Sequence, residues 1–136
     1  MIDVDNIPPV GDDELLARFI VNSNEFRQDD TVKPKLFMPY SRVELSVNRH
    51  RDCTETEIWG VGYKVAEARR RTLYGRADIK ASSTRIAPLG VVLDPLLPAN
   101  PNHAVITRFP PAKEDQQALA VKLAAAASKR LSPPDR

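Results

Sequence analysis

Twelve prolines break this chain of 136 residues into short segments. Each proline fixes its own φ angle and removes a backbone hydrogen-bond donor, so helices and central strands must form between prolines. The chain is long enough to bury one ordinary hydrophobic core, and its apolar fraction of 42% is typical of globular proteins. The sequence therefore predicts a single domain made of short elements, and neither a fibre nor a wholly disordered chain.

The strongest strand signal runs from Arg42 to His50. Apolar and polar side chains alternate there, and this period of two is typical of a half-buried strand. Residues 73–81 alternate small or apolar side chains with polar ones, which predicts a second strand. Apolar runs predict two more strands over residues 87–93 and 104–107.

Three helices are predicted around these strands. Asp12 is suited to cap the first, because the apolar residues that follow it fall on one helical face. Thr54 and Glu57 fit a capping box that opens the second, and a run of alanines predicts the third. The helices are expected over residues 12–22, 55–72 and 114–129.

Strands grouped between helices predict the α+β class, with a mostly antiparallel sheet of about four strands packed by about three helices. We expect an N-terminal arm over residues 1–11, a single domain over residues 12–130 and a disordered tail over residues 131–136. No segment has the length and apolar character of a membrane-spanning helix, and the N-terminus lacks the features of an export signal. The expected location is the cytoplasm.

The sequence contains none of the standard catalytic or metal-binding motifs. Gly60 and Gly62 lie within a predicted helix and lack the third glycine of a dinucleotide-binding loop. Cys53 is the only cysteine, which excludes a disulfide within the chain and a zinc site built from several cysteines. We expect no metal and no cofactor, and the sequence leaves open whether the protein is an enzyme.

Both histidines lie at predicted strand ends, in polar clusters. If these ends meet, His50 and His103 can act as a general acid and base, since imidazole titrates near neutral pH. Arg49, Arg51 and Asn102 would then hold an anionic group such as a phosphate. The competing interpretation is structural, with the same residues forming a solvated strand rim and a turn.

Charge is distributed unevenly along the chain. Residues 1–30 carry eight acidic and two basic side chains, whereas residues 64–85 are strongly basic. Because phosphates attract arginine, nucleic acid is one candidate partner. The residues expected to contact it are Lys64, Arg69, Arg70, Arg71 and Arg76. The alternative is that the three consecutive arginines only offset the dipole at a helix end.

The absence of a catalytic motif favours an accessory or protein-interaction domain, with another protein or a second copy of the chain in a homodimer as its partner. The acidic first 30 residues would then pair with a basic surface of the same chain or of its neighbour. The alternative function is that of a small enzyme or binder directed at a phosphate-bearing ligand or RNA. This alternative uses His50 and His103 with Arg49 and Arg51.

Three short segments carry a resemblance: A-R-F-I at residues 17–20, L-S-V-N-R at residues 45–49 and N-P-N-H-A-V-I at residues 100–106. Their combination resembles a pattern found in small hypothetical proteins of bacteria. The resemblance implies a bacterial source, and it transfers no functional residue to this chain.

Overall fold

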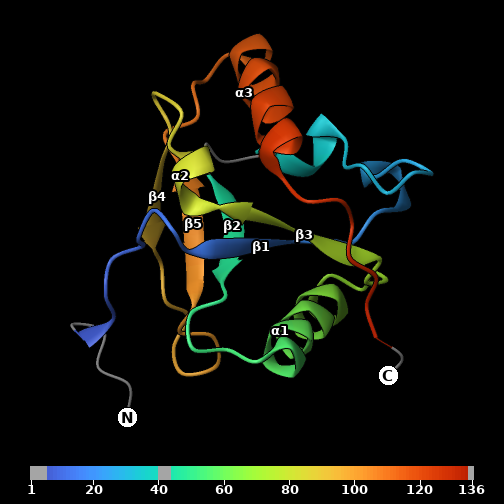
Figure 1. Ribbon diagram of the computed structural model, residues 1–136, viewed down its shortest axis with the longest axis vertical. Coiled ribbons are helices and arrows are strands. Elements are labelled where there is room, and N and C mark those ends of the chain that lie inside the picture. Colours follow the sequence, from blue (N-terminus) through green and yellow to red (C-terminus); the bar gives the residue numbers. More distant parts are fainter. Residues whose placement is uncertain (1–5, 40–43, 135–136) are drawn as a thin grey trace.

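The fold is built on a five-stranded antiparallel sheet with the strand order β3-β1-β2-β5-β4 (Figure 1). The computed structural model describes residues 6–39 and 44–134. The predicted α+β class is confirmed. The five strands are β1 (Leu15–Ile20), β2 (Leu45–Arg49), β3 (Gly75–Lys80), β4 (Gly90–Leu93) and β5 (His103–Thr107).

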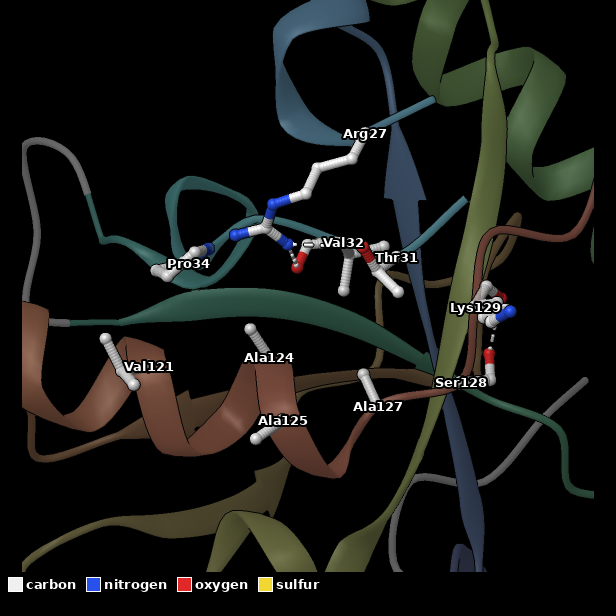
Figure 2. Close-up of a pocket in the computed structure, with 10 residues that line it drawn as sticks. All are labelled: Arg27, Thr31, Val32, Pro34, Val121, Ala124, Ala125, Ala127, Ser128 and Lys129. Carbon is white, nitrogen blue, oxygen red and sulfur yellow. Dashed lines mark hydrogen bonds between the residues drawn. The ribbon is translucent and has the colours of Figure 1, made fainter. Parts of the chain in front are cut away.

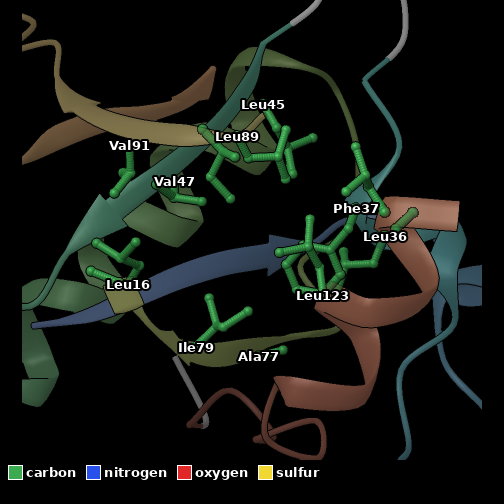
Figure 3. Packing of buried hydrophobic residues seen from close by; sticks show 14 of the residues in the cluster. Leu16, Leu36, Phe37, Leu45, Val47, Ala77, Ile79, Leu89, Val91 and Leu123 are labelled. Carbon is green, nitrogen blue, oxygen red and sulfur yellow. The ribbon is translucent and has the colours of Figure 1, made fainter. Parts of the chain in front are cut away.

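Two longer helices cover opposite faces of the sheet (Figure 1). On one face, α1 (Glu55–Ala68) buries Ile58 and Trp59 against Ala17 and Phe19 of β1. The other face carries the larger core, which α3 (Lys113–Ala126) closes through Leu123 (Figure 3). The remaining elements are α2 (Ala81–Thr84) and the 3-10 turns η2 (Ser23–Glu25) and η3 (Pro34–Phe37).

The helix predicted over residues 12–22 is wrong, because this segment contains strand β1. β1 lies between β3 and β2, and both of its faces are covered. Leu16 and Ile20 face the larger core, while Ala17 and Phe19 face α1. A strand buried on both faces has a continuous apolar sequence without alternation, which is difficult to distinguish from a helix by its pattern.

Arg18 is the one charged residue within β1, and it is 7% exposed. Its Nε donates to the carbonyl of Leu36 at 3.0 Å, and its Nη1 donates to the carbonyl of Ser46 at 3.1 Å. These bonds satisfy a buried cation that would otherwise be costly. They also join η3 and β2 to β1.

The other predicted elements are present, most with shorter bounds, whereas β5 and α3 each begin one residue earlier than predicted. β2 lies within the predicted strand 42–50, although Arg42 and Val43 fall outside the described residues. The capping box of α1 is confirmed: Glu57 N donates to Thr54 Oγ1 at 3.2 Å, and Thr54 N donates to Glu57 Oε1 at 3.0 Å. α1 ends at Ala68 and not at residue 72.

The segments outside the predicted domain make specific contacts. In the lead-in, Val10 is buried in the larger core. Disorder is predicted for residues 131–134, but Leu131 exchanges backbone hydrogen bonds with Arg76 of β3 at 2.9 and 3.1 Å. Tyr63 Oη donates to the carbonyl of Pro134 at 2.6 Å. Residues 1–5 and 135–136 of the predicted arm and tail lie outside the described residues.

No helix in the described ranges combines the length and the apolar content that crossing a membrane requires.

Candidate anion-binding site

The two histidines lie on the sheet face that α1 covers in part, and each binds a different acid. The β2–β5 register places His103 opposite Asn48, two residues before His50. His50 Nε2 is 2.9 Å from Asp78 Oδ1, and His103 Nδ1 is 3.2 Å from Asp94 Oδ2. Within the described ranges no hydrogen bond joins the two rings. Each ring is held by its own carboxylate, and the paired acid and base stay a prediction.

His50 belongs to a closed network of charges at the N-terminal end of α1. Asp78, which binds His50, also accepts from Arg76 Nε at 3.1 Å. Arg76 Nη2 donates to Glu55 Oε1 at 2.9 Å, and its guanidinium lies 4.7 Å from the centre of the Trp59 ring. Arg76 is only 2% exposed. It is therefore not available to nucleic acid.

The pKa values of the two acids agree with this structural role. Burial is the largest influence on the pKa of Asp78 and raises it, but hydrogen bonds and positive charge from His50 and Arg76 outweigh burial and lower the pKa below its ordinary value. The hydrogen bond from Arg76 likewise lowers the pKa of Glu55. Both acids are ionised at neutral pH, and they compensate the buried guanidinium.

The three residues predicted to hold an anion are engaged within the protein. Arg49 is 1% exposed, and its guanidinium binds both carboxylate oxygens of Glu14, at 2.7 and 2.8 Å, and the carbonyl of Pro8 at 2.9 Å. Arg51 Nη1 donates to Asn102 Oδ1 at 3.0 Å, and Asn102 Nδ2 donates back to the Arg51 carbonyl at 2.7 Å. This placement does not favour the predicted anion-binding role.

His103 lines a hollow of about 250 Å³ between α1, β2 and the loop before β5. Its Nδ1 lies 2.9 Å from the backbone carbonyl of Asp94. A carbonyl only accepts, so Nδ1 is the ring nitrogen that donates in this contact. Beside the ring, the amides of Asn48 and Asn100 bind each other at 2.9 and 3.1 Å. Arg69, at the end of α1, lines the same hollow.

Two further hollows adjoin this one at the C-terminal end of α1. Val21 lines all three of them, and Arg71 lines the two further ones. One has a volume of about 560 Å³ and is lined by Val21, Asn22, Lys35, Arg69 and Arg71. The other has a volume of about 310 Å³ and is lined by Val21, Asn22, Ser23, Asn24, Arg70, Arg71, Thr72 and Tyr74. We call these three adjoining hollows the basic hollow.

Three consecutive arginines of the basic hollow are exposed and have no acidic partner in the parts of the chain that the structure describes. Arg69, Arg70 and Arg71 are all exposed, and none of them takes part in an ion pair or a side-chain hydrogen bond there. Glu25 is buried nearby, and its Oε1 accepts from the amides of Val21 and Asn22. The positive charge therefore remains available to solvent.

The backbone of this corner is unusual for arginine. Arg71 N donates to the carbonyl of Ala66 at 2.9 Å and Arg70 N donates to that of Glu67 at 3.0 Å, which is the Schellman pattern. In this pattern the first residue after the helix C-cap takes the left-handed conformation. Arg70 is in that position, and its φ is 54°. Glycine is the usual residue there, because a side chain costs about 1 kcal/mol in that region.

A separate hollow of about 290 Å³ lies between α3 and residues 27–34 (Figure 2). Figure 2 shows the guanidinium of Arg27 beside Val32 and Thr31, on the wall of the hollow that faces α3. Arg27 Nη1 donates to the Val32 carbonyl at 3.0 Å and to Thr31 Oγ1 at 3.3 Å. Arg27 thus holds the loop of residues 27–32 in place. The opposite wall, formed by α3, is apolar, and its Val121 is 53% exposed. This hollow is less suited to an anion than the basic hollow.

Two residues of these sites are not predicted from the sequence: Asp78 and Asp94, which bind the histidines. Asp78 alternates with apolar residues in a predicted strand. This alternation indicates on which face of the sheet Asp78 lies, but not that His50 is its neighbour. Within the described residues, no three His, Cys, Asp or Glu side chains gather closely enough to hold a metal ion.

Comparisons with known proteins give no match to a family model, to a curated protein or to a solved structure. The resemblance to small bacterial proteins stays a prediction. The geometry of this chain is therefore the basis on which its function is proposed.

Proposed function

We propose that this protein binds a phosphate-bearing ligand in the basic hollow, at the C-terminal end of α1. The observation that carries the proposal is the run of Arg69, Arg70 and Arg71, exposed around adjoining hollows without acidic partners among the described residues. A concave surface lined by charges of one sign raises the local concentration of ligands of the opposite sign. Guanidinium groups also match the geometry of phosphate oxygens.

The neutral side chains of the basic hollow suit the rest of such a ligand. Asn22, Ser23 and Thr72 offer amide and hydroxyl groups beside the arginines. Tyr74 lines the same wall, and its ring packs against Phe26 with the ring centres 6.1 Å apart. An aromatic ring held in this way provides a face on which a nucleobase can stack. These features favour a nucleotide unit over a bare inorganic anion.

A single-stranded nucleic acid and a mononucleotide are two sources of this chemistry. The test measures binding of a labelled short oligouridylate by fluorescence anisotropy at low salt, with UMP and inorganic phosphate as competitors. Contacts between three arginines and phosphates predict that log Kd rises with log salt with a slope of about 2. Competition by UMP at concentrations close to those of the oligonucleotide indicates a mononucleotide site, whereas weak competition indicates a strand.

Matched charge variants test the site. Changing Arg69, Arg70 and Arg71 together to glutamine is expected to weaken oligouridylate binding by about tenfold or more. The control changes Lys80, Lys113 and Lys122 to glutamine, because these exposed lysines lie outside the basic hollow and carry the same total charge. Equal losses in both triple variants, or no binding by the unaltered protein at low salt, would show that the proposal is wrong.

An accessory or protein-interaction role is the second candidate. Val92, Leu96 and Leu97 favour it, because these apolar side chains are 46%, 51% and 39% exposed and lie on or just after β4. Exposed apolar groups near a strand edge are typical of an interaction surface.

A further inference from the structure

The two edges of the sheet differ in how they are covered. At the β3 edge, Leu131 exchanges hydrogen bonds with Arg76, and Ser128 N donates to the carbonyl of Asp78 at 2.8 Å. The chain following α3 therefore covers this edge. At the other edge, β4 pairs only with β5 in the described part of the chain.

Two residues of β4 point their backbone N–H and C=O groups away from the sheet. Asp94 N donates to the carbonyl of His103 at 2.9 Å, so Asp94 points its backbone groups towards β5. Successive residues of a strand alternate in this direction, so Val91 and Leu93 point theirs away from β5. Neither residue has another backbone partner among the described residues. Unpaired groups of this kind form a template for another strand.

The sequence of β4 lacks the features that usually protect such an edge. Gly90, Val91, Val92 and Leu93 include no charged residue and no proline. The Val92 side chain is 46% exposed on the face away from the larger core. An incoming strand would therefore meet neither repulsion nor a steric block from β4 itself.

We propose that β4 pairs in antiparallel fashion with β4 of a second copy, so that the sheet continues through a homodimer. A two-fold axis beside Val92 places Val91 opposite Leu93 of the second copy, where their outward backbone groups can bond. It also places the two Val92 side chains together on one face. Directly opposed residues in such a pair have Cβ atoms about 5 Å apart.

Charge at the two ends of β4 selects a second copy as the occupant. A Cβ at Gly90 would lie 2.7 Å from Arg108 Nη2, so this guanidinium lies over the start of β4. Asp94 follows the other end and its side chain is 53% exposed. Antiparallel self-pairing places Asp94 of each copy opposite Gly90 of the other, beside Arg108. Two identical copies thus supply complementary charges at both ends.

Sedimentation velocity on the full chain over a range of concentrations tests this dimer. The unaltered protein is expected to show a reversible monomer–dimer equilibrium. Asp94→Arg and Arg108→Asp should each raise the dimer Kd by about tenfold or more, because each brings like charges together. The double variant restores opposite charges and should recover most of the affinity. The substitution Arg108→Asp should not disturb the backbone, because aspartate tolerates the φ of 67° at position 108.

Leu93→Pro provides a second test that does not depend on charge. It removes the outward N–H of Leu93 together with a side chain that packs at the margin of the larger core, so loss of the dimer counts only while circular dichroism stays like that of the unaltered protein. A monomer at every concentration would overturn the proposal. So would a dimer that the single charge variants and Leu93→Pro leave unchanged. If a variant fails to fold, recovery in the charge-swapped double variant still decides the case.

Discussion

The two ends of α1 handle positive charge in opposite ways. At the N-terminal end, Arg76 is 2% exposed and bound to Glu55 and Asp78. At the C-terminal end, Arg70 and Arg71 are exposed and have no acidic partner among the described residues. Both groups of arginines lie in the same basic segment of sequence. Their surroundings, and not their position in that segment, determine whether the charge is available to a ligand.

This difference separates structural charge from charge that can bind. A buried guanidinium with two carboxylates contributes to the fold only while its partners remain, since an unpaired buried charge is costly. An exposed arginine contributes little to stability, so its loss should affect binding and leave the fold intact.

The largest effect is expected at the closed end of α1. Asp78→Asn removes the acid that joins His50 to Arg76, and it should lower the free energy of unfolding by about 3 kcal/mol. Asp12→Asn is the control, because Asp12 pairs with Arg85 at the surface, where such pairs contribute up to about 1 kcal/mol. Urea denaturation measures both. Equal effects of the two substitutions would contradict a structural role for the network.

The next effect concerns how α1 lies on the sheet. A Cβ at position 62 would lie 2.7 Å from Phe19 Cε1, so Gly62→Ala should lower the free energy of unfolding by about 2 kcal/mol. A Cβ at position 60 meets nothing within 4 Å, so Gly60→Ala should raise stability by about 0.5–1 kcal/mol. Thermal unfolding of the two variants distinguishes these outcomes. A gain in stability for Gly62→Ala would mean that α1 does not approach β1 this closely.

A smaller effect should appear on acidification. Since the pKa of Asp78 is lowered in the folded protein, its carboxylate stabilises the fold at neutral pH. This contribution is lost as the pH falls below the ordinary Asp value of 3.8 and through the lower pKa of the folded protein. The stability difference between the unaltered protein and Asp78→Asn should therefore shrink in that range. A difference that stays constant with pH would contradict the lowered pKa.

The sequence predicts most of the fold for local reasons. The capping box of Thr54 and Glu57 marks the start of α1, and the alternation after Val43 marks β2. β1 was missed because burial on both faces removes the alternation by which a strand is recognised. The acidic residues before it predict the start of a helix, but Glu14 binds Arg49, a contact between residues distant in sequence.

The site is less accessible to sequence reasoning than the fold. The sequence marks Arg70 and its neighbours as basic, and it places both histidines at strand ends. It does not give the partner of His50, because contact with Asp78 depends on how β2 and β3 flank β1. The left-handed backbone of Arg70 likewise follows from where α1 ends, and helix ends are poorly determined by local propensity.

Arg70→Gly tests the central claim most directly, when oligouridylate affinity and the free energy of unfolding are measured on the same preparation. Glycine relieves the strain at a φ of 54° and removes one unpaired charge. We expect weaker binding together with unchanged stability or a gain of about 1 kcal/mol, whereas Arg70→Lys should keep most of the affinity. Unchanged binding in Arg70→Gly would contradict a ligand role for this arginine, and a clear loss of stability would show that its function is structural.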